Sequence, residues 1–114
     1  MIAVMFEVEI AEGQKETYLE TAAALREQLE QVDGFVSVER LQSLSAPEKL
    51  LSLFFWRDEA AVHRWREVAE HRSAQSRGRS GIFAGYRLRV AGVVRDYGMA
   101  DRVQAPADSR SMHG

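Results

Sequence analysis

The chain of 114 residues contains no cysteine and only two prolines. Without cysteine it can form no disulfide, no thiolate nucleophile and no cysteine-ligated zinc or iron–sulfur site. It also lacks an apolar run of about 20 residues, which a membrane-spanning helix needs. The start of the chain, MIAVMFEVEI, has no basic region of the kind that opens a signal peptide. We therefore expect a cytoplasmic protein with no membrane partner.

An excess of positive charge is missing too. Lys and Arg total 15, Asp and Glu total 17, and the net charge is −2. Nucleic-acid binders are usually basic, so we expect no nucleic-acid partner. The charges are nevertheless separated along the chain, with eight acids and two bases in residues 1–34 but nine arginines and four acids in residues 57–95. This asymmetry favours either an anionic ligand or two complementary surfaces.

Familiar cofactor and nucleophile motifs are also absent. The sequence has no GxGxxG, no P-loop and no GxSxG motif. His63 and His71 stand eight residues apart, which is not the spacing of an HExxH zinc site. We therefore expect no metal site.

The apolar periodicity predicts four strands and two helices. Alternating residues predict strands over 2–10, 35–42, 49–57 and 82–95, and spacings of three and four predict helices over 14–32 and 59–79. Gly34 suits a left-handed cap after the first helix, and Asp58 can cap the second. This β-α-β-β-α-β order is that of the ferredoxin-like motif. We expect an α+β fold in which two helices cover one face of a four-stranded antiparallel sheet.

The third predicted strand is apolar on both faces, which requires cover on both sides of the sheet. Leu51, Leu53 and Phe55 form one of its faces. We assign the other face, with two residues of the first strand, to the side that the helices leave bare. This set is Leu50, Phe54, Trp56, Met5 and Ala3. An isologous homodimer, packed sheet against sheet, would bury it.

The final stretch, DYGMADRVQAPADSRSMHG, is polar and has no clear period. We therefore expect one domain over 1–98 followed by an extended or disordered tail over 99–114. On the last strand, Arg87 and Arg89 alternate with apolar residues, which predicts a salt-bridged outer face with Glu7 and Glu9 of the first strand as partners.

The second helix holds the densest group of polar candidates. On a helical wheel, His71 and Gln75 share a flank with Val68, beside the apolar stripe that is centred on Trp65. Both polar residues suit either a pocket or a surface rim, and Trp65 suits either the core or a pocket wall. Arg72 lies nearly over Trp65, where it would pair with an acid, extend past the helix end or hold an anionic group.

Three runs carry a resemblance to a known family: FFWRDEAAVHRWR, EHRSAQSRGR and YRLRVAGVVRDYG. Together with the element order, they make residues 1–98 resemble the antibiotic biosynthesis monooxygenase (ABM) superfamily, and in particular a bacterial branch of it. The resemblance implies a dimeric α+β barrel with a pocket between the sheet and the helices of each subunit. Some members oxidise aromatic substrates with O₂ and no cofactor, and others degrade haem.

The resemblance leaves haem as the alternative cofactor. Haem-degrading relatives use an Asn on the first strand, a Trp on the second helix and an axial His ten residues after it. Here Trp65 matches the Trp, but Gln75 stands ten residues later and the first strand offers Phe6 or Glu7. These departures weaken the haem-degrading interpretation. His71 stands one helical turn earlier, and a shifted register or a helix break near Ala69-Glu70 would direct it into the pocket.

A cofactor-free monooxygenase needs a dry apolar pocket, a base and hydrogen-bond donors for a developing oxyanion. The sequence offers His71 as the base, with Arg72 and Gln75 completing the candidate catalytic set. The candidate substrate-binding residues, with Tyr86 as a further donor, are Phe6, Phe54, Trp65, Phe83 and Tyr86. We expect a small aromatic or quinol-like substrate. The remaining alternative is a non-catalytic dimer module that binds a small ligand.

Overall fold

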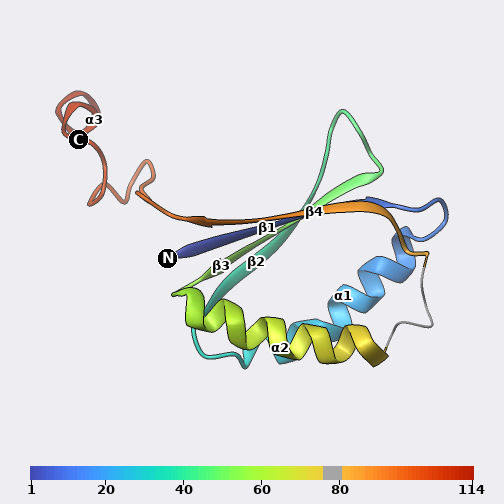
Figure 1. The fold of residues 1–114 in the computed structure, drawn as a ribbon. Coiled ribbons are helices and arrows are strands. Elements are labelled where there is room, and N and C mark those ends of the chain that lie inside the picture. Colours follow the sequence, from blue (N-terminus) through green and yellow to red (C-terminus); the bar gives the residue numbers. More distant parts are fainter. Residues whose placement is uncertain (76–80) are drawn as a thin grey trace.

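The computed structural model describes residues 1–75 and 81–114, with the side chains of α2 described as far as Val68 (Figure 1). In chain order, the elements are β1 (Ile2–Ile10), α1 (Lys15–Glu30), β2 (Phe35–Gln42), β3 (Lys49–Trp56), α2 (Glu59–Gln75), β4 (Phe83–Gly92) and α3 (Ala107–His113). The strands form one antiparallel sheet in the order β2-β3-β1-β4. Helices α1 and α2 lie on the same side of this sheet (Figure 1). The predicted ferredoxin-like α+β fold is therefore confirmed.

Strand register decides which side chains share a face. Ile2 pairs with Trp56 and Val4 with Phe54, so these β3 residues point to the same side as the even-numbered residues of β1. Val4 packs with Leu29 of α1, which identifies this side as the one that the helices cover.

This register corrects one assignment made from the sequence. Leu50, Phe54 and Trp56 face the helices, so placing them with Met5 and Ala3 on the bare face was wrong. The residues that do share the outer face with Met5 and Ala3 are Leu51, Leu53 and Phe55. The alternation within β3 was read correctly, but its pairing with β1 was shifted by one residue, which exchanges the two faces.

The core lies between the sheet and the two helices, in two clusters. One contains Val4, Leu29, Trp56 and Ala61, with Trp56 only 1% exposed. The second cluster lies toward the other end of β1 and contains Val8, Ile10, Tyr18 and Leu50.

Three chain segments meet where α1 ends and α2 begins. Gly34 has a φ of 94°, and a β-carbon placed on it would lie 2.6 Å from the Ala61 Cβ. The Gly34 carbonyl accepts a hydrogen bond from the Arg57 amide at 2.7 Å. Asp58 caps α2, because its Oδ1 accepts a hydrogen bond from the Ala61 amide at 2.9 Å. The predicted cap at Asp58 is confirmed. Gly34 has the predicted positive φ but does not cap α1, because the helix ends at Glu30 with Gln31 as its C-cap and Gly34 lies in the turn that follows.

The Arg57 guanidinium connects this junction electrostatically. It donates to both carboxylate oxygens of Asp33 at 3.2 Å and to Asp58 at 2.9 Å. These hydrogen bonds hold the pKa of Asp33 and of Asp58 below the ordinary range of an aspartate and raise the pKa of Arg57. Arg64 adds a hydrogen bond from α2 to the Asp33 carbonyl at 3.0 Å. The start of α2 is thereby tied to the end of α1.

The outer face of the sheet carries both apolar and charged residues. Arg89 of β4 and Glu7 of β1 form an ion pair at 3.3 Å, as predicted from the alternation in the last strand. The pair forms because β1 and β4 are neighbours in the sheet.

After β4 the chain leaves the sheet. The Val93 amide donates to the Met1 carbonyl at 2.9 Å, and the following segment extends away from the helices and strands (Figure 1). It contains the short helix α3, which the sequence analysis does not predict. In residues 1–75 and 81–114, no helix combines the length and the apolar character needed to cross a membrane.

We predict that Gly34→Ala destabilises the fold by about 2 kcal/mol or more, because it combines a positive φ with a collision against a buried methyl group. Urea unfolding of purified protein measures this change. Gly13→Ala is the matched control, because Gly13 has a φ of 79° but no neighbour within 4 Å of the new β-carbon. It should cost about 1 kcal/mol. Equal losses for the two variants would contradict the collision.

Candidate functional site

An apolar surface lies on the helix side of β4 and is the candidate site. Its members on β4 are exposed to solvent on a face that elsewhere forms the core, and Phe6 of β1 lies partly buried beside them. We call it the β4 patch, and it consists of Phe6, Phe83, Tyr86, Leu88 and Val90. Tyr86 is 70% exposed, Leu88 51% and Val90 50%. Because β4 is the edge strand beside β1, this part of the helix-covered face is left accessible.

Three predicted substrate-binding residues meet in the β4 patch. The ring centroid of Phe6 lies 5.8 Å from that of Phe83 and 5.7 Å from that of Tyr86, and the Phe83 and Tyr86 rings are 6.4 Å apart. Edge-on and tilted contacts of this kind are favourable between aromatic rings. They form a wall suited to a planar apolar ligand.

The other two predicted substrate-binding residues lie at the opposite end of the same face. The Phe54 and Trp56 rings are stacked with their centroids 6.3 Å apart, and the centroid of the Trp65 ring of α2 lies 6.4 Å from that of Trp56. Both pack against the core cluster around Trp56 while keeping part of their surface exposed. The structure therefore gives the five predicted aromatics one common side of the sheet but divides them between two groups.

The candidate catalytic residues belong to the last part of α2. His71, Arg72 and Gln75 lie within the helix, but their side chains fall outside those that the structure describes. Their backbone positions lie on the same side of the sheet as the β4 patch (Figure 1). Whether these side chains enter the site stays a prediction.

Sequence reasoning missed Leu88 and Val90. The signal was available, because they alternate with Arg87 and Arg89 and so had to face the side opposite the charged residues. It also missed a buried hydroxyl pair beside the patch. Tyr18 Oη lies 3.1 Å from Ser52 Oγ, and the centroids of the Tyr18 and Phe83 rings are 5.7 Å apart. Ser52 is 1% exposed and pairs with Phe6 across the sheet.

The described residues at the patch are apolar or uncharged. The described histidines lie elsewhere, with His63 exposed beside Glu67 at 3.2 Å and His113 exposed in α3. In residues 1–75 and 81–114, no group of His, Asp and Glu residues is arranged to hold a metal ion.

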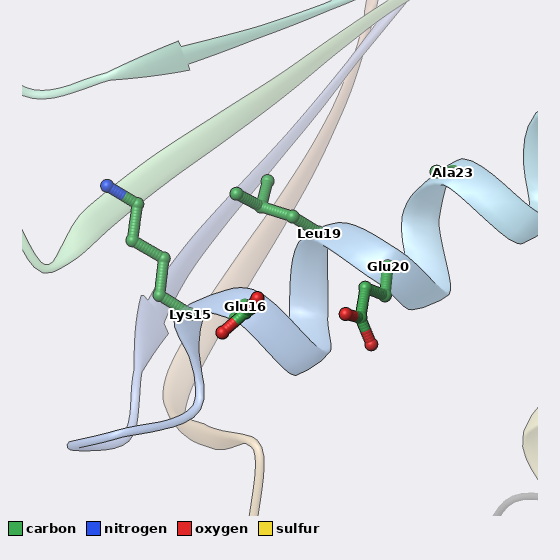
Figure 2. Close-up of a pocket in the computed structure, with 5 residues that line it drawn as sticks. All are labelled: Lys15, Glu16, Leu19, Glu20 and Ala23. Atoms are coloured by element: carbon green, nitrogen blue, oxygen red, sulfur yellow. The ribbon is translucent and has the colours of Figure 1, made fainter.

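A separate hollow of about 480 Å³ lies on the outside of α1. Its lining residues are Lys15, Glu16, Leu19, Glu20 and Ala23 (Figure 2). All five come from one helix and none belongs to the predicted site. We assign this hollow no role, because charged side chains that point to solvent do not enclose a ligand.

Residues 1–77 match the family model of the antibiotic biosynthesis monooxygenases. The chain belongs to the ABM family. A curated relative, the "Jasmonate monooxygenase ABM" of the fungus Pyricularia oryzae, is 47% identical over 93 residues, which are 82% of this chain and 43% of the fungal protein. The chain thus spans less than half of that relative. YqjZ of Bacillus subtilis is 32% identical over 78 residues, which are 68% of this chain and 67% of YqjZ.

Solved ABM-like structures share the fold at low sequence identity. A Deinococcus radiodurans protein assigned to this family superposes with a TM-score of 0.73 at 12% identity, covering 86% of this chain and 97% of its own. The heme-degrader MhuD of Mycobacterium tuberculosis, with two hemes bound, gives 0.69 at 20% identity, covering 86% and 100%. The common fold therefore accounts for nearly all of each neighbour but not for all of this chain.

We predict that Tyr18→Phe and Ser52→Ala each lower the free energy of unfolding by about 1–2 kcal/mol. Each substitution removes one hydroxyl of the pair and leaves the other buried hydroxyl without its hydrogen-bond partner. The double variant should lose less than the sum of the single losses, which a double-mutant cycle by urea unfolding measures. Thr21→Ala removes an exposed hydroxyl of α1 that bonds the Thr17 carbonyl, and it should change stability by no more than about 0.5 kcal/mol. Additive losses would show that the two hydroxyls do not interact.

Proposed function

We propose that this protein is a cofactor-independent monooxygenase that binds a small aromatic or quinol-like substrate on the β4 patch. Membership of the ABM family supports the reaction class. The observation that carries the substrate class is an aromatic wall in which Phe83 and Tyr86 are accessible and the partly buried Phe6 contacts both rings. Exposed aromatic rings of this kind offer stacking and edge contacts to a planar aromatic ligand.

The proposed chemistry draws its electrons from the substrate. In oxidation of an anthrone, the methylene carbon loses two hydrogens, one atom of O₂ becomes the new carbonyl oxygen and the other leaves as water. Before O₂ reacts, the protein must remove a proton from the methylene carbon and stabilise the resulting oxyanion in a dry site. We assign the base to His71 and the donors to Arg72, Gln75 and the Tyr86 hydroxyl. Phe54 and Trp65 would extend the wall toward the centre of the face.

The relative from Pyricularia oryzae is named a jasmonate monooxygenase, so jasmonate is included among the substrates to be assayed. Insertion of one oxygen atom into a C–H bond of such a substrate needs two further electrons from a reductant. Assays with and without an added reductant therefore distinguish the two kinds of substrate. Jasmonate should react only with the reductant, whereas an anthrone or quinol supplies its own electrons.

We predict O₂ uptake with an anthrone, quinol or catechol in the absence of any added cofactor, measured with an oxygen electrode.

Leu88→Ala should lower kcat/KM about tenfold through loss of apolar contact, while Leu44→Ala, in a fully exposed loop position, should not change it. Tyr86→Phe separates the two roles of Tyr86, because a wall keeps its function without the hydroxyl and a donor does not. His71→Ala should abolish turnover.

Two outcomes would overturn this proposal. A Soret band on addition of hemin, lost in His71→Ala, would support haem as the cofactor instead. Absence of uptake with every substrate, with and without reductant, would leave a non-catalytic module that binds a small ligand.

We also propose that the protein is a homodimer that pairs through the outer face of its sheet. The apolar residues of this face form a continuous band across β2, β3 and β1, since Leu41 pairs with Leu51, Leu53 with Met5 and Phe55 with Ala3. These residues are Ala3, Met5, Leu41, Leu51, Leu53 and Phe55. A band of this kind would be buried by an isologous contact with the same band of a second copy.

Sedimentation at micromolar concentration should give twice the chain mass of 12.9 kDa. Leu53→Asp should give the mass of a single chain, because it places an unpaired charge in the centre of the contact. Leu44→Asp, the matched control in the exposed loop between β2 and β3, should remain a dimer. A single-chain mass for the unaltered protein would contradict the dimer.

A further inference from the structure

The segment after β4, residues 94–114, extends away from the rest of the molecule, and we call it the arm. The chain has a radius of gyration of 16.8 Å and a longest dimension of 55 Å. A compact chain of this length has a radius of gyration of about 13 Å. The difference is accounted for by the arm, which Figure 1 shows reaching beyond the Met1 end of the sheet.

The arm has a defined structure of its own. Arg102 donates to the carbonyl oxygens of Gly98 at 3.1 Å and of Gly114 at 2.9 Å, and its guanidinium lies 5.3 Å from the centroid of the Tyr97 ring. Arg110 donates to the carbonyls of Val103 and Ala105 at 3.0 Å each. Two arginines thus fold the arm around backbone acceptors within the arm itself.

Four large apolar side chains of the arm are nevertheless turned to solvent, although Ala105 is buried. Met99 is 99% exposed, and the other three, Val94, Val103 and Met112, are between 76% and 81% exposed. A module this small cannot bury enough apolar surface by itself to be stable. Its fixed shape together with its exposed apolar residues therefore indicates a docking element whose receptor is not its own subunit.

We propose that the arm docks in trans on a second copy of this chain and covers the β4 patch of that copy. The inference rests on the site and the dimer proposed above. The patch supplies what the arm lacks, because Tyr86, Leu88 and Val90 form an exposed apolar row along a sheet edge. Reciprocal exchange of two arms would satisfy both copies by the same symmetry operation.

The proposed sheet-against-sheet dimer would bring the arm within reach of this receptor. The arm follows Val93, whose amide bonds the Met1 carbonyl, so it leaves the sheet at the Met1 end of the edge strand β4. If the two-fold axis crosses the strands, the Gly92 end of one β4 lies over the Phe83 end of the other. The arm then has only to pass around the free edge of β4 to reach the helix side. Pairing of the sheets raises its effective concentration there.

Docking would change what the site is. With the arm in place, Met99 and Val103 of one copy would form the outer wall of an apolar pocket whose inner wall is the β4 patch of the other. Water would be excluded from the surface on which the substrate is proposed to lie. Each site would then be built from two chains, and the arm would contribute to its substrate selectivity.

The absence of cysteine allows a direct cross-linking test. A tagged copy carrying Met99→Cys is mixed with an untagged copy carrying Leu88→Cys, allowed to exchange subunits and treated with a short bismaleimide. Docking in trans predicts a covalent tagged–untagged pair, formed at least ten times more efficiently than with Leu44→Cys in place of Leu88→Cys. Unaltered circular dichroism and sedimentation show that each variant folds and assembles like the parent.

A second pair of variants tests the contact itself. Val103→Glu and Met112→Glu together should reduce the cross-link about tenfold, whereas Leu44→Glu in the same background should not. Cross-linking no better than with the Leu44→Cys control overturns the inference. A single chain that carries both Met99→Cys and Leu88→Cys is tested as well, and a cross-link that forms only within that chain overturns the inference too. The readout needs no substrate, so a protein without monooxygenase activity can still show docking in trans, and an active one can fail to show it.

Discussion

The close approach of Gly34 to Ala61 is the constraint on which the placement of the second helix depends. It requires a residue without a side chain at a positive φ, and it brings the end of α1 against the first turn of α2. Arg57 then binds Asp33 and Asp58 and ties both helices to the end of β3. Because α2 is directed from this junction, the position of every candidate catalytic residue farther along the helix follows from it.

Strand order divides the sheet into three surfaces with different uses. The helix side of β1 and β3 is core, the outer side is an apolar band with an ion pair at its margin, and the helix side of β4 is accessible. One backbone arrangement thus supplies a core, a proposed dimer contact and a proposed substrate surface. The exposure of Tyr86, Leu88 and Val90 is what distinguishes the last of these, which lies on one of the two edge strands of the sheet.

Family membership and the site describe different levels of function. The ABM match gives the class of protein, and the solved neighbours at 12–20% identity establish the fold alone. The contacts of Phe6 with Phe83 and Tyr86 and the buried Tyr18–Ser52 pair are features of this chain's own side chains, and the proposed substrate class rests on the first of them. A protein without cysteine has no thiol of its own to supply electrons, and the proposed reaction takes them from the substrate.

The sequence by itself determined the order of the four strands and of α1 and α2, their positions to within a few residues, the Asp58 cap and the family, because each rests on local periodicity, on backbone preference or on short motifs. It did not predict α3, which lies in a segment without clear periodicity. Only the tertiary structure decided which face of β3 meets the helices, since pairing register is set between strands and not within one. It also decided that Phe6, Phe83 and Tyr86 meet while Phe54 and Trp65 lie with Trp56, and that Leu88 and Val90 join the first group. These contacts join residues far apart in the chain, and alternation fixes the face on which a side chain lies but not its neighbour across the sheet.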